Sequence, residues 1–571
     1  MNEVHKNLIL TTVQNNKVVV LTASCGFGKS TMVPPLLSET YQDKKVIVSQ
    51  PRRIATIQVQ KRVSQTFKNV KSGYAVRFDE NYTQQTQLIY MTEGILLQLL
   101  QNPGFDFGNT ILILDEAHEL SSNLTLILQL VKKNLNNLFK IVISSATVQV
   151  KPFVKYLSGF PLHIDLQSFK VETKQFQESI FEPLKDNISL GAYMRTYLKR
   201  VQTQIERLLP LTENNILVFL PGLFEINHLI TQFKHINSHI FQPFHANQTE
   251  MFNNRTVYLS TNVAETSLTL PNIDFVVDSG LQRRQIFNTF TKQDELVDEF
   301  IAVENMMQRR GRCGRVQNGV YYQMFPLYLL KKQKFEIQIS DCSNIILRLL
   351  HDTKQELNKL DLICYPDREI LSYNISVLHY HAFIDQNGAL TELGLFALKL
   401  EFLTINQIKL LFLSMNSNQF VKCAQIIAFL HAFQTQRVNM NQIELCSFKN
   451  ELSDLETIWN LTQSLKGDNL IKESAQYGLD FFCLRTYFKI LKKLLQLNEN
   501  SKNQKEFNKI IEEAYKDKIC SNMCGISFNG FIQKEVSISP QSGVKILKTH
   551  KFIYDEAFQK VDIQINAIHV I

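Results

Sequence analysis

A glycine-bearing loop is the first segment of this sequence whose residue types could do chemistry. It covers residues 23–30, follows the apolar run 18–21, and contains Gly26, Gly28 and Lys29. Glycine has no Cβ, so such a backbone can turn sharply and present its N–H groups to phosphate oxygens. The lysine can then reach the β- and γ-phosphates, while the hydroxyl of Ser30 can bind Mg²⁺. The loop therefore predicts a site for a nucleoside triphosphate.

Two adjacent carboxylates, Asp115 and Glu116, close a second apolar run at 111–114. We expect Asp115 to bind Mg²⁺ directly or through water, with Ser30 and Glu116 as further candidate ligands. Glu116 is the expected general base, polarising the water that attacks the γ-phosphate. Acidic residues also follow strands as simple solvated turns. The phosphate loop upstream favours the catalytic interpretation.

Both segments need strands to position them. A third apolar run at 140–144 leads into hydroxyl residues, of which Ser145 and Thr147 could link the carboxylates to another element, or only satisfy backbone groups. The alternation of short apolar runs with helix-compatible segments predicts a parallel α/β sheet. Further runs begin at 215, 256, 274 and 319 and predict a second parallel sheet, which has no phosphate loop.

The second half carries four arginines within the eight residues 308–315. On a helix, Gln308, Arg312 and Arg315 would share one face. Arginine is always charged and binds phosphate oxygens in a bidentate manner. This face could act as an arginine finger towards a nucleotide on the first lobe, which would make the two lobes a nucleotide-dependent switch. A solvated basic helix or a general nucleic-acid patch is the alternative.

These motifs occur in a fixed order with several others. The segments lie at 49–53, 73–78, 90–94, 115–118, 145–147, 219–222, 260–269 and 308–315. Together they resemble one family, the DEAH-box RNA helicases of helicase superfamily 2, over nearly the whole chain. The resemblance implies an α/β fold with two tandem RecA-like parallel-sheet domains, followed by a winged-helix domain, a helical ratchet and a short OB-like β domain.

The expected boundaries are RecA-like domain 1 at 1–165 with the P-loop and DEAH motif, RecA-like domain 2 at 166–327, winged-helix 328–398, ratchet 399–522 and OB-like domain 523–571. Residues 388–394 resemble the winged-helix signature, a turn followed by a helix. Residues 481–497 are amphipathic, and a plain helical bundle without RNA contacts stays an alternative. Residues 536–539 alternate apolar and polar residues, as an OB-like strand would.

The resemblance also implies site roles. Nucleotide contacts fall on Gly26, Phe27, Gly28, Lys29, Ser30, Thr31, Arg62, Phe252 and Asp278; Arg62 and Phe252 would sandwich the adenine, and Asp278 would lie near the ribose. Catalytic roles fall on Lys29, Glu116, Gln308, Arg312 and Arg315, and coupling roles on His118, Ser145 and Thr147. RNA-backbone contacts fall on Arg52, Arg53, Arg77, Thr92, Thr261 and Thr266. ATP and Mg²⁺ are the implied cofactors. Residues 281–300 are the implied strand-separating β-hairpin, with an ordinary surface hairpin as the alternative.

The sequence departs from the family pattern in two segments. In the phosphate loop, Ala23 takes the usual place of glycine, and Ser24 and the bulky Phe27 replace polar or small residues. These changes put the rate of turnover in question. Residues 243–247 replace a segment that contacts RNA through a hydroxyl in the family, which puts that RNA contact in question.

Composition limits the classes of protein. The net charge of +8, from 61 basic and 53 acidic residues, permits nucleic-acid binding. Nine cysteines without zinc-like paired spacing favour free thiols. The sequence shows no signal peptide and no run long enough to span a membrane. We expect a monomer in the nucleus or cytoplasm, with the nucleus favoured by the resemblance.

We therefore predict an ATP-dependent RNA helicase or translocase that moves 3′ to 5′ on single-stranded RNA, in pre-mRNA splicing or ribosome biogenesis. Spliceosome or pre-ribosome components and a glycine-patch activator are the implied protein partners. Three alternatives stay open: an ATPase that remodels ribonucleoprotein without separating strands, a catalytically weak RNA-binding scaffold, and a viral or bacterial relative acting on viral transcripts or DNA.

Overall fold

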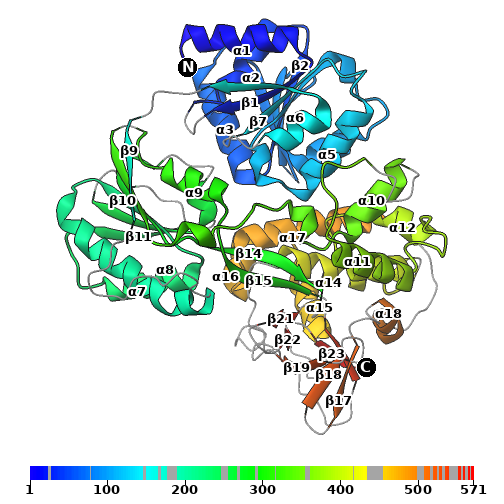
Figure 1. Cartoon of the computed structure of the whole chain (residues 1–571). Coiled ribbons are helices and arrows are strands. Elements are labelled where there is room, and N and C mark those ends of the chain that lie inside the picture. Colours follow the sequence, from blue (N-terminus) through cyan, green and yellow to red (C-terminus); the bar gives the residue numbers. More distant parts are fainter. Residues whose placement is uncertain are drawn as a thin grey trace. The chain divides into compact units, whose positions relative to one another are not determined.

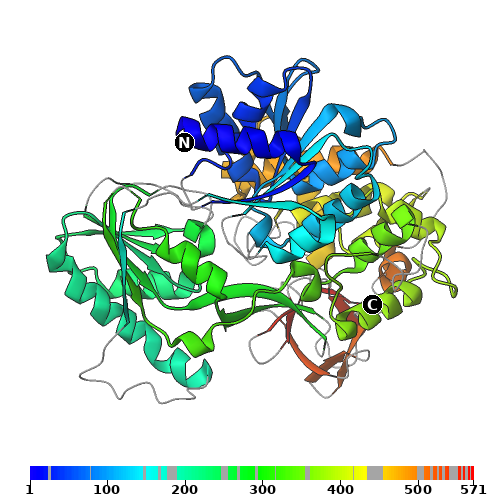
Figure 2. The ribbon, with the colours of Figure 1, turned by 45° about the horizontal axis from the view of Figure 1, so that its top comes forward.

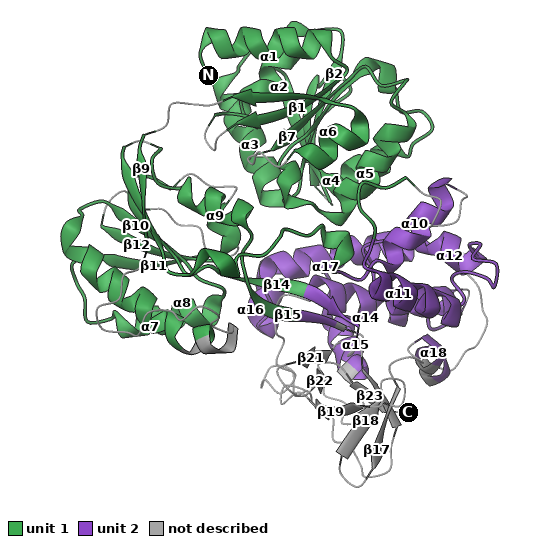
Figure 3. Cartoon of the chain, viewed as in Figure 1, with its two compact units in different colours: residues 1–285, 296–339, 361–365 green, residues 286–295, 340–360, 366–571 purple. Residues whose placement is uncertain are grey.

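The computed structural model describes residues 1–23, 27–77, 79–145, 150–164, 169–175, 190–245, 252, 255–265, 270–289, 293–315, 317–353, 361–415, 417–433, 454–497, 507–514, 519–523, 526–529, 534–538, 551–554, 557–559, 563–565 and 568–570. They divide into two compact units (Figure 3): unit 1 contains residues 1–285, 296–339 and 361–365, and unit 2 contains 286–295, 340–360 and 366–571. The expected site residues Gly26, Thr147 and Thr266 lie outside the described residues.

An eight-stranded sheet forms the first half of unit 1 (Figure 1). Its strands are β1 (Val18–Ala23), β2 (Lys45–Gln50), β3 (Ser72–Val76), β4 (Asp79–Asn81), β5 (Leu88–Thr92), β6 (Thr110–Leu114), β7 (Lys140–Ser145) and β8 (Phe160–Ile164). The order is β4-β3-β5-β2-β6-β7-β1-β8, and β3–β4 is the antiparallel pair. Because β2 and β7 flank β6, the carboxyl ends of these three strands lie side by side.

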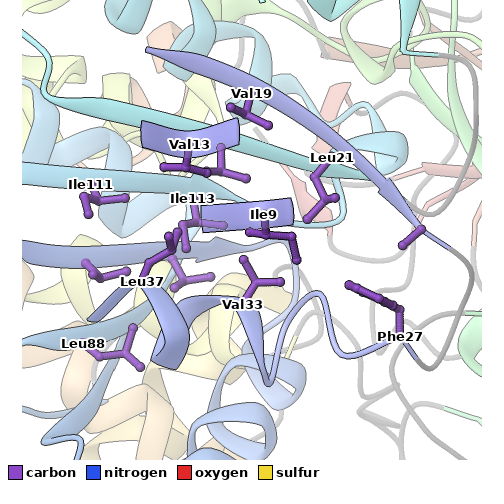
Figure 4. Close-up of a cluster of buried hydrophobic side chains, with 14 of the residues drawn as sticks. Ile9, Val13, Val19, Leu21, Phe27, Val33, Leu37, Leu88, Ile111 and Ile113 are labelled. Carbon is purple, nitrogen blue, oxygen red and sulfur yellow. The ribbon is translucent and has the colours of Figure 1, made fainter. Parts of the chain in front are cut away.

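The helices of this half are α1 (Glu3–Asn15), α2 (Val33–Thr40), α3 (Arg53–Thr66), α4 (Glu93–Leu100), α5 (Ser122–Lys133) and α6 (Lys151–Leu157), with the 3-10 turns η1 (Phe107–Asn109) and η2 (Ala117–Glu119). The turned view in Figure 2 shows α1 lying across the sheet. Ile9 of α1 and Val33 of α2 pack with the strand residues Leu21 and Ile113 (Figure 4). Phe27 belongs to the same cluster and is only 2% exposed, so the bulky residue of the phosphate loop serves the core.

A six-stranded parallel sheet forms the second half of unit 1. Its strands are β9 (Val171–Gln175), β10 (Asn215–Phe219), β11 (Ile240–Phe244), β12 (Thr256–Ser260), β13 (Ile273–Asp278) and β16 (Gly319–Gln323), in the order β11-β12-β10-β13-β16-β9. The helical elements are α7 (Leu190–Leu208), η3 (Leu209–Leu211), α8 (Leu223–Gln232), η4 (Asn262–Glu265), α9 (Val303–Arg310), η5 (Leu327–Leu329) and η6 (Glu336–Gln338). Ile216 and Val218 pack with α7 and α8, while Leu217 and Phe219 enter a separate cluster. This alternation follows from the two-residue period of a strand.

The predicted hairpin is present as β14 (Leu281–Asn288) paired with β15 (Gln293–Phe300). Unit 2 contains its far end and the helices α10 (Ser343–Thr353), α11 (Arg368–Tyr380), α12 (Glu392–Ala397), α13 (Ile405–Ser414), α14 (Phe420–Ala432), α15 (Asp454–Ser464), α16 (Leu470–Tyr477), α17 (Phe481–Leu495) and α18 (Phe507–Ala514). The predicted turn before α12 is present: Gly388 has φ +77°, and the Thr391 side chain caps the helix by accepting a hydrogen bond from Gly394 N.

A seven-stranded sheet lies in the C-terminal part of unit 2. Its strands are β17 (Ile519–Met523), β18 (Ile526–Asn529), β19 (Lys534–Ile538), β20 (Lys551–Tyr554), β21 (Ala557–Gln559), β22 (Ile563–Ile565) and β23 (Ile568–Val570). The β character predicted for this part is therefore confirmed, whereas the proposed domain boundaries stay predictions. Across the described ranges, no helix is both long and apolar enough to cross a membrane.

Candidate active site

Asp115 lies at the carboxyl end of β6 and is 1% exposed. Ser144, at the end of β7, donates its hydroxyl to Oδ1, and the Gln50 amide, at the end of β2, donates to Oδ2 at 2.5 Å. The hydroxyl of Ser30 also bonds to this carboxyl group. The sheet order brings these groups together, because β2 and β7 flank β6. Asp115 is therefore held by a fixed set of hydroxyl and amide donors.

Lys29 lies close to this carboxylate. Its side chain is 6% exposed, and its ammonium group donates to the Ala23 carbonyl at 2.6 Å. Burial raises the pKa of Asp115, and Glu116 adds to that rise; the Ser144 and Ser30 hydrogen bonds and the charge of Lys29 oppose it. A cation beside Asp115 would favour its charged form. Carboxylate, hydroxyl and ammonium groups thus converge at one edge of the sheet.

Glu116 begins a strained turn. Its backbone is left-handed, with φ 54° and ψ 35°, and Leu120, which ends the same turn, has φ 53°. A non-glycine residue pays about 1 kcal/mol or more for this conformation. Such outliers cluster at functional sites, where the surrounding structure holds them in place. The turn therefore gives the expected base, Glu116, a backbone geometry that does not form without support.

His118 sits within this turn, buried, with Nδ1 3.5 Å from Glu116 Oε2. Burial lowers the pKa of His118 to about 3; the charges of Lys29, Arg52 and Arg312 lower it further, while Asp115 acts against them. The imidazole is therefore neutral near pH 7. The contact between His118 and Glu116 is therefore not an ion pair, because the imidazole carries no charge.

The arginine-rich segment differs from the prediction in one respect. Gln308 lies in the last turn of α9, but the helix ends at Arg310, so the shared helical face with Arg312 and Arg315 is wrong. Glycine explains the difference, because Gly311 caps the helix and Gly314 has φ +73°. Arg312 is buried and donates to the Glu265 carbonyl. The charge of Arg312 helps to lower the pKa of His118.

Comparisons with known proteins agree with this geometry. The model of the DEAD/DEAH box helicases matches residues 2–154, and that of the helicase conserved C-terminal domain matches residues 201–317. The first covers the phosphate loop and Asp115, and the second covers the arginine-rich segment. The chain therefore contains a DEAD/DEAH box helicase domain followed by a helicase conserved C-terminal domain. The resemblance seen in the sequence is thereby confirmed.

Curated relatives carry related names. The chain is 28% identical to the ATP-dependent RNA helicase HrpA of Borreliella burgdorferi, over 81% of this chain and 59% of that protein. It is 28% identical to a putative pre-mRNA-splicing factor ATP-dependent RNA helicase, C20H4.09, of Schizosaccharomyces pombe, over 83% and 73%. It is 31% identical to the ATP-dependent RNA helicase DHX30 of Gallus gallus, over 68% and 35%. The chain thus spans between about a third and three quarters of the length of these relatives.

A solved structure matches the fold. The crystal structure of Escherichia coli DEAH/RHA helicase HrpB covers 100% of this chain, and the chain covers 70% of that structure. The TM-score is 0.79 at 21% sequence identity. At that identity the likeness shows the fold alone. It supports two tandem RecA-like domains followed by a helical region, as the helicase motifs predicted.

The other residues expected to contact the nucleotide lie in several separate parts of unit 1. Gly28 has φ +95°, a conformation that suits glycine, and Thr31 lies in the turn that leads into α2. Arg62 is exposed on α3 and Phe252 is partly exposed beside Tyr258, whose hydroxyl bonds to the Phe252 backbone. No contact joins these two side chains among the described groups, and the adenine sandwich stays a prediction.

Asp278 is fully buried. Its Oδ1 accepts hydrogen bonds from Arg309 and the Gly280 amide, and its Oδ2 accepts one from Tyr321 at 2.7 Å. Both carboxylate oxygens are thus engaged within the second sheet. The expected ribose contact stays a prediction, and it requires the buried carboxylate to become accessible.

The described residues expected to bind RNA lie at the ends of strands in the two sheets or at the starts of the helices that follow them. Arg52 precedes α3 and pairs with Glu119 at 3.2 Å, whereas Arg53 is exposed. Arg77 is exposed after β3, Thr92 precedes α4, and Thr261 follows β12. Carboxyl ends of parallel strands are the usual binding edge of open α/β sheets. The positions suit backbone contacts, which stay predictions.

Sequence reasoning missed several residues that fix this site. Gln50 and Ser144 hold Asp115, and each lay inside a segment that had been recognised, next to residues given other roles. Arg309 was passed over in favour of its neighbours. It is 0% exposed and bonds to Glu265 at 2.7 Å and Asp278 at 2.7 Å. The residue types gave a signal, but the partners could not be read from local sequence.

Proposed function

We propose that this chain is an ATP-dependent RNA helicase or translocase that remodels RNA or RNA–protein complexes. The observation that carries the proposal is the site around Asp115, where Lys29, Ser30 and the strained Glu116 meet. Lys29 would bind phosphate oxygens, and Glu116 would accept a proton from the attacking water. The relatives are named ATP-dependent RNA helicases, which supports ATP as the nucleotide and RNA as the substrate.

The residues present fit Mg²⁺. The Asp115 carboxylate and the Ser30 hydroxyl are hard oxygen donors, which Mg²⁺ prefers, and it usually keeps water and phosphate oxygens as its other ligands. When bound, the ion would neutralise phosphate charge. The chain's own groups do the rest: Gln50 and Ser144 orient Asp115, and the left-handed turn aims Glu116.

RNA would be gripped through its backbone by Arg52, Arg53, Arg77, Thr92 and Thr261. Phosphate and sugar contacts give affinity without reading sequence, so many RNAs would serve. By family resemblance the motion is 3′ to 5′. Splicing or ribosome biogenesis is the proposed setting, with spliceosome or pre-ribosome components and a glycine-patch activator as candidate partners and the nucleus or cytoplasm as the location. The name of the Schizosaccharomyces relative favours splicing.

The test is ATP hydrolysis by the full chain, with and without single-stranded RNA and Mg²⁺. Glu116→Gln serves as the matched blank, because it keeps the size of the side chain and removes the base. We expect RNA to stimulate turnover in the wild type, with the Glu116→Gln chain still binding ATP but hydrolysing it slowly. Near-wild-type turnover in Glu116→Gln rejects Glu116 as the base. No turnover in any condition, even with a glycine-patch activator, favours the RNA-binding scaffold.

A second candidate is a ribonucleoprotein remodeller that does not separate strands. Its support is the far end of the hairpin, where Phe287 stacks on Tyr373 of α11 at 5.3 Å and Thr289 donates to Glu369 at 3.4 Å. These contacts pack the far end of the hairpin against α11 within unit 2. A hairpin that wedges between RNA strands would instead expose these side chains to RNA. If the hairpin is a wedge, Phe287→Ala should abolish duplex unwinding and leave RNA-stimulated hydrolysis in place. A remodeller that does not separate strands should show RNA-stimulated hydrolysis without unwinding already in the wild type.

A further inference from the structure

A short segment of unit 1, residues 331–336, lies between two features that the proposed mechanism treats separately. It follows β16 and η5 in the chain. On one side it contacts the strands of the hairpin, and on the other it contacts the turn that begins at Glu116. We call it the strap. Neither the family motifs nor the predicted site residues include it.

The hairpin side of the strap is held by three contacts. The Lys331 amide donates to the Ile301 carbonyl, directly after β15, at 2.9 Å. The Lys331 ammonium pairs with Glu299 of β15 at 3.1 Å. Arg284 of β14 donates to the Lys334 carbonyl at 3.2 Å. Both hairpin strands are therefore bonded to the strap, and a shift of the hairpin must move it or break these bonds.

The other side of the strap supports the strained turn. The Gln333 side chain donates to the His118 carbonyl at 2.6 Å, across 215 positions of sequence. The Glu336 amide donates to the Leu120 carbonyl at 2.9 Å, and the Glu336 carboxylate accepts from the Ser122 amide at 2.8 Å. These bonds act on the stretch between Glu116 and the start of α5. They support the left-handed residue Leu120 directly and Glu116 through the turn.

We propose that the strap couples the hairpin to the hydrolysis site, with Gln333 as a positioning residue for Glu116. The inference rests on the proposed function. Gln333 lies next to Lys334, the residue that Arg284 holds, so a hairpin displaced by RNA pulls on the carbonyl of His118 through one peptide unit. Because the turn is strained, its geometry depends on such outside support. RNA at the hairpin would then change the rate of the chemical step without touching ATP.

The first experiment compares steady-state ATP hydrolysis, with and without single-stranded RNA, in Gln333→Met and Gln333→Lys chains. Methionine keeps the length of glutamine and has no N–H donor, whereas lysine keeps a donor. We expect Gln333→Met to lower the RNA-stimulated kcat about fivefold with the KM for ATP unchanged, since one hydrogen bond is lost. Gln333→Lys should recover most of that loss. Lys332→Ala is the control, because Lys332 is an exposed residue of the same strap.

The second experiment is a double-mutant cycle between Arg284→Ala and Gln333→Met, read on RNA-stimulated kcat. If the strap transmits the signal, the double variant is no slower than the slower single variant. Additive losses, an unchanged kcat in Gln333→Met, or a change confined to KM overturn the coupling role. A wild-type chain that does not hydrolyse ATP removes the proposed function, and this inference with it. If the wild type is active and Gln333→Met hydrolyses ATP equally fast, only the coupling role of the strap is rejected.

Discussion

Replacing Arg309 by methionine should destabilise the second half of unit 1 more than any neighbouring substitution. The guanidinium is fully buried and stacks 4.7 Å over the Phe219 ring. Burial alone would lower the pKa of Arg309, but Asp278 and Glu265 raise it above its usual range. Methionine has a similar length and can fill most of the space. It leaves both carboxylates buried with no cation between them.

The expected size of the effect follows from those contacts. Arg309 makes charged hydrogen bonds to Glu265 and Asp278, each at 2.7 Å, and bonds to the Leu281 carbonyl at 3.1 Å. Removing one partner from a buried charge cluster costs about 3–5 kcal/mol. For a domain of this size, about 4 kcal/mol lowers the unfolding temperature by roughly 8–16 °C. Loss of hydrogen-exchange protection in peptides covering β13 and α9 would locate the change in this sheet.

Arg310→Met supplies the matched control, because the same side chain is changed one position along. Arg310 is partly exposed and bonds to the neutral groups Thr173 Oγ1 at 3.0 Å and Val171 O at 2.9 Å. Its loss should cost about 1 kcal/mol. Asp278→Asn added to Arg309→Met should restore part of the stability. Equal unfolding temperatures for the two methionine variants would refute the reasoning from buried charge.

Three further predictions concern single residues. Arg315→Ala should lower kcat by at least about 100-fold with a smaller loss of ATP affinity, because an arginine finger acts on transition-state charge; a pure affinity loss in steady-state assays would make it a ground-state ligand. Burial raises the pKa of Glu93 from 4.5 to about 7, so its contribution to stability is complete below pH 4.5 and is lost as the pH rises through 7. Glu93→Gln should therefore gain stability over wild type across that window, up to about 3 kcal/mol by denaturation at pH 8, and a pH-independent difference would contradict this. Gly280→Ala should lose about 2 kcal/mol or more, because φ is +73° and a Cβ would lie 2.3 Å from the Phe325 ring, whereas Gly388→Ala meets nothing within 4 Å and should lose about 1 kcal/mol when thermal unfolding is compared.

Much of the fold could be predicted because its signals are local. The apolar runs that begin at 215, 256 and 319 became β10, β12 and β16, since a buried parallel strand needs little more than a short run of apolar residues. The phosphate loop and the carboxylates were found for the same reason. Each sits directly after such a run, and the carboxyl ends of parallel strands meet at one edge.

The rest of the site depends on contacts that local sequence does not contain. Gln50 and Ser144 reach Asp115 only because β2 and β7 flank β6, and strand order is a property of the whole sheet. The end of α9 was missed for a different reason. Helical spacing placed Arg312 with Gln308, but the glycine at 311 decides where the helix stops. Phe27 was judged by its size against phosphate, whereas its side chain enters the core.

The turn between Glu116 and Leu120 is poised between opposing terms of similar size. Its two left-handed residues cost about 1–2 kcal/mol each. The three hydrogen bonds that Gln333 and Glu336 make with this stretch stabilise it by about 1 kcal/mol each. Because these magnitudes nearly balance, docking of the strap decides whether the turn keeps the geometry that aims Glu116. Under the proposed coupling, a modest movement of the hairpin strands would suffice to change the rate of the chemical step, and a variant that loses only the Gln333 donor tests that balance directly.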